Sequence, residues 1–203
     1  FYRPVTEDFG YAPRVRVPII LHSSRAELNR SFGWEAKENA IGVYYAGVIR
    51  ALAPQSWIYE DSPDGVKETF VTAGPMAHEF THLMIDYLTG GNYPRWFTEG
   101  MAQYEEYKLT GFTFNDPAGA VNHGFYSMKD IAENFDDLPN QSLAYQEAFG
   151  AVRYIAGEYG EETLHDLIRS LGAGMEFENA MQKHLNLDYA GLEKCRRAWA
   201  SSK

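Results

Sequence analysis

The sequence predicts an α+β fold in which a small mixed β-sheet precedes a mainly α-helical region. Two segments rich in β-branched and aromatic residues, 14–23 and 40–54, lie near the start of the chain. After residue 75, apolar residues instead recur every three or four positions, which is the spacing of amphipathic helices. A chain of 203 residues is long enough for one domain with a sizeable core. We therefore expect a single domain over residues 1–203, with a sheet-containing lobe at about 1–91, a helical lobe at about 92–203 and a cleft between them.

The sheet is expected from the two strand-like segments. In 14–23, alternating Arg and Val residues pass into the apolar run Ile19–Leu21, which predicts a strand that is exposed at first and buried later. Segment 40–54 is interrupted by two glycines and ends at a proline, so it predicts either one strand or a bent hairpin. An edge strand can pair with an extended peptide through its backbone groups, and 40–54 is the best candidate for that role.

Shorter elements are expected around these strands. Residues 1–14 are either a short helix that ends at Gly10 or a leader into the first strand. Ser24–Glu27 has the sequence of a capping box and predicts a short helix that stops at Gly33. Ser62–Gly65 is a turn signal on the approach to the next helix.

The remainder of the chain predicts helices joined by short connections. Residues 94–108 form an amphipathic run that opens with a proline, whereas 111–126 contain Gly, Asn and Pro and predict a loop. Ser127 should cap a short helix, and the apolar stripe over 142–159 predicts a long one. Further stripes continue to the C-terminus, where Asp188 should cap the last helix.

The pentapeptide HEFTH, residues 78–82, specifies a chemistry. On a helix, residues four apart lie about one turn apart on the same face, so His78 and His82 can bind one metal ion. Glu79 follows the first histidine, and its carboxylate can reach a water on the metal as a general base. Pro75 suits a helix start and Gly90-Gly91 a helix end. The motif therefore indicates a zinc hydrolase.

A carboxylate in the next amphipathic run completes the pattern. Glu99 follows His82 by seventeen residues and lies in the run that Pro94 opens. A carboxylate on a second helix that crosses the first is the usual third ligand of a catalytic zinc site with two histidines and one glutamate. We expect His78, His82 and Glu99 to be the metal ligands.

The sequence resembles the gluzincin metallopeptidases, and within them the bacterial peptidase MA-like family. Members of this family carry HExxH followed by a P-x-W-x-x-E-G-x-A pattern, and this chain matches that pattern at Pro94, Trp96, Glu99, Gly100 and Ala102. Weaker similarity extends over the segments GVYYAGVI, AYQEAFGAVRYIAGEYG and GLEKCRRAWA. The resemblance implies a zincin-like fold and one Zn²⁺ per chain. It also implies a peptide or protein substrate and an extracytoplasmic or membrane-tethered location in a bacterium.

One position departs from the pattern of the family. In thermolysin-like gluzincins, an acidic residue four positions after the glutamate ligand supports a zinc histidine. Here that position is Gln103. A side-chain amide oxygen can still accept a hydrogen bond from an imidazole N–H, but less strongly than a carboxylate.

The resemblance also implies a second electrophile that stabilises the oxyanion of the reaction. In gluzincins it is a Tyr or His from beyond the metal helices. The candidates are Tyr145, Tyr126 and His123, of which Tyr145 stands where the family has a Tyr. Tyr145 is equally explained as the first core residue of its apolar stripe.

Composition excludes several other classes of function. A net charge of −10 and only short clusters of Lys and Arg argue against a nucleic-acid partner. No apolar run is long enough for a membrane span, although an anchor upstream of Phe1 is compatible with the family. The single cysteine, Cys195, excludes an intramolecular disulfide and a multi-cysteine metal site.

Two main hypotheses for the function remain open at this point, besides a weaker third, the zinc-assisted hydrolysis of a non-peptide amide. The first is zinc-dependent hydrolysis of peptide bonds, with Glu79 and Tyr145 as catalytic residues. The alternative is a catalytically silent, zinc-containing protein-binding module of the same fold. Glu79 favours the enzyme, because a purely structural metal site needs ligands and has no use for a general base.

Overall fold

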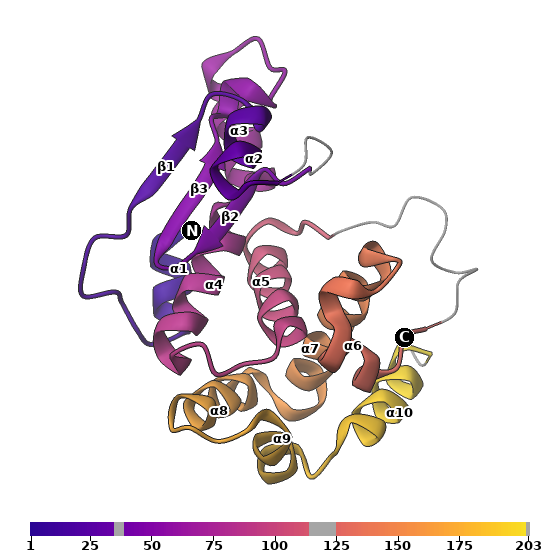
Figure 1. Ribbon diagram of the computed structural model, residues 1–203. Coiled ribbons are helices and arrows are strands. Elements are labelled where there is room, and N and C mark those ends of the chain that lie inside the picture. The colour runs from indigo at the N-terminus through magenta and orange to yellow at the C-terminus, as the bar shows by residue number, and fades with distance from the viewer. Residues whose placement is uncertain (35–38, 114–124, 202–203) are drawn as a thin grey trace. The chain divides into compact units, whose positions relative to one another are not determined.

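The structure is a computed structural model that describes residues 1–34, 39–113 and 125–201 (Figure 1). It divides into two compact units. The first consists of Phe1–Met84 with Glu105–Phe112, and the second of Ile85–Tyr104 with Thr113–Lys203. Two helices, α4 (Met76–Thr89) and α5 (Arg95–Thr110), each contribute residues to both units.

The first unit contains a three-stranded mixed sheet. Its strands are β1 (Ile19–His22), β2 (Gly42–Tyr45) and β3 (Val48–Leu52), in the order β1-β3-β2. Strand β1 runs parallel to β3 and β2 runs antiparallel to it. A small mixed sheet thus precedes a helical region, which confirms the predicted α+β fold class.

Segment 40–54 forms the hairpin β2-β3. Ala46 and Gly47 connect the strands with φ angles of 47° and 82°. Positive φ at both central residues is the signature of a two-residue turn whose twist matches that of the strands. Only a glycine adopts this conformation without steric cost, which accounts for Gly47.

The prediction for the first strand was partly wrong. Strand β1 covers only Ile19–His22, because Pro18 lacks an N–H and the partner strand β3 begins at Val48. The expected burial of Ile19–Leu21 is also wrong, since these side chains are 39–55% exposed. The reason is the strand order, which places β1 at an edge of the sheet.

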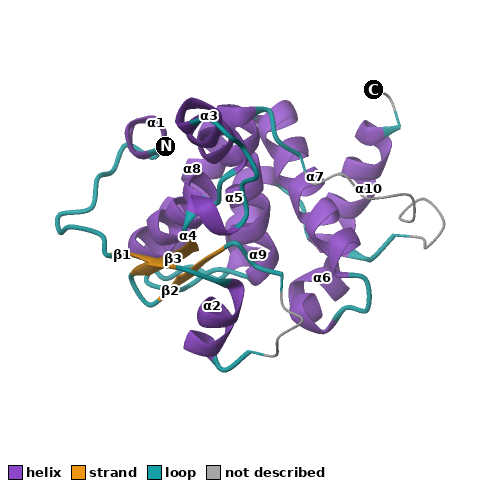
Figure 2. Ribbon diagram, turned by 90° about the horizontal axis from the view of Figure 1, so that it is seen from above, coloured by secondary structure: helices purple, strands orange, loops and turns teal. Residues whose placement is uncertain are grey.

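Helices cover both faces of this sheet. Figure 2 shows α2 (Arg25–Phe32) and α4 on opposite sides of it. On the α4 side, a buried core joins the sheet, α4 and the short helix α1 (Tyr2–Asp8); it consists of Val5, Ile49, Ala51, Met76, Phe80, Leu83 and Met84. On the other side, the Ser24 hydroxyl accepts the N–H of Glu27 and α2 ends at Gly33 in the left-handed region, as the capping box predicted.

A further helix, α3 (Pro63–Ala73), begins at the residues that were predicted to form a turn. The Ser62 side chain accepts the backbone N–H of Gly65, and Pro63 stands at the first helical position. The residues of the expected turn are therefore a helix N-cap and first turn, because Ser-Pro is as suitable for starting a helix as for a turn.

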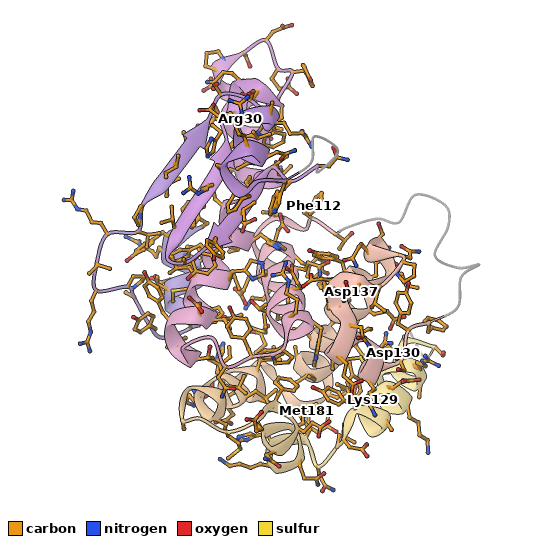
Figure 3. All side chains as sticks on the ribbon, in the orientation of Figure 1. Arg30, Phe112, Lys129, Asp130, Asp137 and Met181 are labelled. Carbon is orange, nitrogen blue, oxygen red and sulfur yellow. The ribbon has the colours of Figure 1, made fainter. Side chains whose placement is uncertain are left out.

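The second unit is helical. Besides its parts of α4 and α5 it contains α6 (Met128–Asn134), α7 (Gln141–Tyr159), α8 (Glu161–Gly172), α9 (Phe177–Leu185) and α10 (Tyr189–Ala200). Short 3₁₀ helices lie at Pro54–Ser56 in the first unit and at Phe135–Asp137 in the second. The predicted caps Ser127 and Asp188 both accept a backbone N–H. Of the residues labelled in Figure 3, Met181 is buried on α9, whereas Lys129 projects from α6 into solvent. Within the described ranges, every helix is too short or too polar to cross a membrane.

Candidate metal centre

Helix α4 carries the HEFTH motif. The N–H of Glu79 donates to the carbonyl of Pro75, so the first turn forms directly after the proline. Phe80, Leu83 and Met84 are almost completely buried in the core of the first unit. This burial fixes the rotation of α4 about its axis and turns His78 and His82 to another face.

A short turn at Gly90–Asn92 connects α4 to the next helix, α5. Gly90 and Gly91 have φ angles of 64° and 84°, which a residue with a side chain rarely adopts, and they end the helix. The side-chain amide of Asn92 donates to the carbonyl of Leu171 in the last turn of α8, at 2.9 Å, and to that of Met175 just after the helix, at 3.0 Å. The turn is thereby fastened to the second unit, to which it belongs.

Helix α5 carries Glu99 and packs closely on α7. Trp96 and Phe97 are completely buried near the start of α5. At Gly100 a Cβ atom would lie 2.5 Å from the carbonyl oxygen of Ala148 and 2.7 Å from Val152 Cγ2, so only glycine fits there. In the E-G pair of the motif, Glu99 thus supplies the carboxylate, and Gly100 allows the backbones of α5 and α7 to approach closely.

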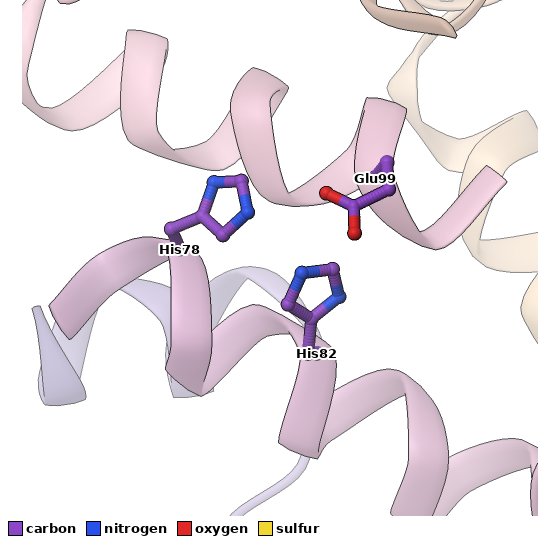
Figure 4. Close-up of side chains that lie close together, drawn as sticks. All are labelled: His78, His82 and Glu99. Atoms are coloured by element: carbon purple, nitrogen blue, oxygen red, sulfur yellow. The ribbon is translucent and has the colours of Figure 1, made fainter. Parts of the chain in front are cut away.

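The structure brings the predicted ligands together. One nitrogen of His78, one of His82 and one carboxylate oxygen of Glu99 all lie within 4.8 Å of one another. Figure 4 shows the two imidazoles on one helix and the carboxylate on the other, pointing toward one another. The ring centroids of the histidines are 4.8 Å apart with the planes at 77°. The Glu99 side chain is only 2% exposed.

These side chains suit a zinc ion. Two imidazoles and one carboxylate are the ligands of many catalytic zinc sites, which keep one further position for water. Zinc bonds of about 2.0–2.2 Å hold ligand atoms roughly 3.4 Å apart in a tetrahedron. Since the observed separations are at most 4.8 Å, side-chain rotation can close the remaining distance.

Glu79 lies beside the cluster without being part of it. Its Oε2 accepts the backbone N–H of Tyr44 at 2.6 Å, which ties the carboxylate to strand β2. A Cβ atom at Gly42 would lie 2.4 Å from Pro75 Cβ and 3.0 Å from Glu79 Cγ. Strand β2 therefore approaches the start of α4 closely enough for a backbone group to position the predicted base.

Arg95 contacts the Glu99 carboxylate. Its Nη2 lies 2.8 Å from Glu99 Oε1, one turn away on α5, and its Nε donates to Asp136 at 3.4 Å. Burial opposes the charged form of the guanidinium, but the negative charges of Glu99 and Asp136 and the proximity of Tyr145 together raise the pKa of Arg95. Arg95 therefore stays cationic and holds one oxygen of the predicted ligand.

The carboxylate beside a histidine comes from Glu106. Its Oε2 lies 3.4 Å from Nδ1 of His78. Gln103, at the position where thermolysin-like gluzincins have an acid, instead donates its amide hydrogens to the carbonyl of Tyr145 at 2.9 Å and to that of Glu99 at 3.2 Å. Gln103, which departs from the family pattern, thus links α5 to α7 by a hydrogen bond.

The three candidates for the second electrophile have different surroundings. Tyr145 lies partly buried in the first turns of α7. It is close enough to Arg95 to help raise the pKa of the guanidinium, and its ring contacts the ring of Phe135 edge-on. The Tyr126 hydroxyl accepts the backbone N–H of Asn140, the residue that caps α7. His123 lies outside the described residues. Of the two that are described, Tyr145 is the one near the residues around Glu99.

Three residues around the cluster, Arg95, Glu106 and Tyr44, were not predicted from the sequence. The first two had a signal, because a residue four before or seven after Glu99 lies on the same face of a helix. Tyr44 contributes a backbone N–H, and which N–H of a strand faces a given carboxylate depends on the tertiary fold.

Comparison with known proteins agrees with this geometry. The model of the Peptidase MA superfamily matches residues 63–202, which is more than half of the chain and includes all three predicted ligands and Glu79. A search of curated proteins found no match.

Proposed function

Because the chain belongs to the Peptidase MA superfamily, we propose that it is a zinc-dependent peptidase of the gluzincin type. One zinc ion per chain would be held by His78, His82 and Glu99, and the substrate would be a peptide or protein. The cluster of these three side chains carries the proposal. Three protein ligands leave a coordination position for water, as in catalytic zinc sites, whereas structural sites are closed by four.

Glu79 would serve as the general base. When bound, zinc lowers the pKa of a coordinated water toward about 7 and polarises the substrate carbonyl. Glu79 accepts the proton of the attacking water and can return it to the leaving amine. The hydrogen bond from the Tyr44 N–H keeps one carboxylate oxygen at strand β2, so that the base is already oriented before substrate arrives.

Strand β2 would bind the substrate backbone. Among the described strands it pairs only with β3, so it is an edge of the sheet. An extended peptide can add to such an edge through backbone hydrogen bonds. Because Tyr44 of this strand contacts Glu79, a peptide lying along β2 would have its scissile bond beside the base.

Tyr145 is the proposed second electrophile. Its place in the first turns of α7 is held by the hydrogen bond from Gln103 to its own carbonyl. The neighbouring Arg95 guanidinium adds positive charge on that side of Glu99. Tyr126 is the alternative, because its hydroxyl accepts the backbone N–H of Asn140 at the start of α7 and can still donate its own hydrogen.

The test combines metal content with hydrolysis. Purified protein should contain about one zinc per chain, and a broad peptide library should be cleaved by the zinc-loaded protein and left intact after chelation. Glu79→Gln should retain zinc but lose several orders of magnitude in kcat, because glutamine cannot accept the proton. Glu68→Gln, the same substitution at an exposed position on α3, is the control and should behave as wild type.

Each failure has its own meaning. Protein that contains no transition metal and takes none up would overturn the metal site. Zinc binding without cleavage of any peptide would favour the silent binding module instead. A Glu79→Gln variant that loses zinc would make Glu79 a ligand in place of the base.

A further inference from the structure

A buried carboxylate on α5 faces the first histidine of the motif. Glu106 Oε2 lies 3.4 Å from His78 Nδ1, and the two side chains are only 7% and 13% exposed. Glu106 follows Glu99 by seven residues, which is two helical turns, so both carboxylates lie on the same face of α5. One helix can thus supply a ligand to the metal and a partner to another ligand.

Gln103 instead bonds to the backbone in the observed arrangement. Its amide nitrogen donates to two backbone carbonyls, those of Glu99 and Tyr145. A carboxylate accepts a hydrogen bond from an imidazole N–H more strongly than an amide oxygen does. The carboxylate that the structure places at His78 is that of Glu106, one turn further along α5.

We propose that Glu106 is the positioning residue of the metal site, which orients His78 by accepting the hydrogen of its Nδ1. This inference rests on the proposed function, since it concerns the same zinc ion. A neutral imidazole that donates from Nδ1 presents the lone pair of Nε2 to the metal, so the partner fixes both the tautomer and the ring orientation. The contact of 3.4 Å is slightly longer than an ordinary N–H···O bond. Such contacts commonly shorten once the site is loaded.

The neighbouring Glu105 offers a matched control. It is also a buried glutamate on α5, and changing it to glutamine replaces a carboxylate of the same size at a neighbouring position. Its partner is Lys108, whose Nζ lies 2.9 Å from Glu105 Oε1. Glu106→Gln and Glu105→Gln therefore differ in whether the lost carboxylate faces His78.

The experiment measures zinc affinity by competition with a chromogenic chelator. Losing a partner of a metal-bound histidine typically weakens metal binding by about 10–100-fold, and we expect this for Glu106→Gln. Glu105→Gln should stay within about threefold of wild type. Glu106→Asp, which keeps the carboxylate on a shorter stem, should fall between them. The tautomer of His78, measured by nitrogen NMR in zinc-loaded wild-type protein, should carry its hydrogen on Nδ1, and this readout needs no Glu106 variant.

The outcomes separate this inference from the proposed function. Wild-type protein that binds no zinc would overturn both. Wild-type protein that binds zinc, with equal affinities for Glu106→Gln and Glu105→Gln, would overturn the role of Glu106 alone. Zinc bound at Nδ1 of His78 would do the same, even if the Glu106 variants fail to fold.

Discussion

Gly100→Ala should destabilise the protein, although alanine is the better helix former. The added Cβ would lie 2.5 Å from the carbonyl oxygen of Ala148 and 2.9 Å from its carbonyl carbon. Both are backbone atoms of α7 and cannot rotate away as a side chain would. Either α5 or α7 must therefore shift.

The magnitude comes from two opposing terms. Overpacking a well-packed interior costs about 1–3 kcal/mol, and a contact with backbone belongs at the upper end of that range. Replacing glycine by alanine inside a helix stabilises the folded state by about 1 kcal/mol. The net loss in the free energy of unfolding should be about 2 kcal/mol, which lowers the Tm of a chain of this size by about 4–8 °C.

Gly150→Ala on α7 is the control. The nearest atom to its added Cβ is Nη1 of Arg196 at 3.4 Å, an ordinary van der Waals contact with a side chain instead of a clash with backbone. Only the helix propensity then changes, so Tm should rise by about 2–4 °C. Thermal unfolding of the chelator-treated proteins, followed by circular dichroism, measures both. If Gly100→Ala is stabilised as much as Gly150→Ala, α5 and α7 do not approach each other as described.

Three further predictions concern the base, the electrophile and pH. Gly42→Ala should push strand β2 and the start of α4 apart, because the new Cβ would lie 2.4 Å from Pro75 Cβ and 3.0 Å from Glu79 Cγ, and so displace the Glu79 carboxylate and lower kcat about tenfold or more; full activity in a peptide assay would contradict this. Tyr145→Phe should lower kcat by about 10²-fold with zinc content and Tm nearly unchanged, and an unaltered kcat would pass the role to Tyr126 or His123. Burial, with a further contribution from Asp8 and against the effect of Lys108, raises the pKa of Glu105 to about 7 from 4.5. Glu105 therefore binds its proton more tightly in the folded state than in the unfolded state, and its contribution to stability is lost as pH rises from about 4.5 to about 7. Glu105→Gln, which has no such proton, should gain stability relative to wild type over the same pH range. Parallel urea-unfolding profiles for the two proteins would refute the last prediction.

Locally encoded features were predictable from the sequence. The HEFTH helix and the carboxylate in the next helix each depend on spacings within a short stretch of chain, and the hairpin was one of the two structures predicted for segment 40–54. The caps Ser24, Ser127 and Asp188 accept backbone N–H groups three residues ahead. Such contacts form within one helical turn, so a few neighbouring residues specify them.

Features that depend on partners far along the chain were not predictable. The run Ile19–Leu21 predicts a buried strand by composition, but its exposure results from the edge position of β1 in the sheet. The backbone of Tyr44 reaches Glu79 only because the hairpin folds onto α4, 35 residues later in the sequence. Ser62–Gly65 illustrates another limit, since the same four residues start a turn or a helix depending on the residues after them.

The attachment of Asn92 has a consequence for engineering the chain. Its amide donates hydrogen bonds to carbonyls 79 and 83 residues away. The short connection between α4 and α5 is therefore held in place and does not readily accept inserted residues. A reporter domain or a new pair of termini placed there would alter the seventeen-residue interval from His82 to Glu99 and release the tie to α8. The segment around Tyr59, whose side chain is 95% exposed between the 3₁₀ turn and α3, is a better place to cut or lengthen the polypeptide.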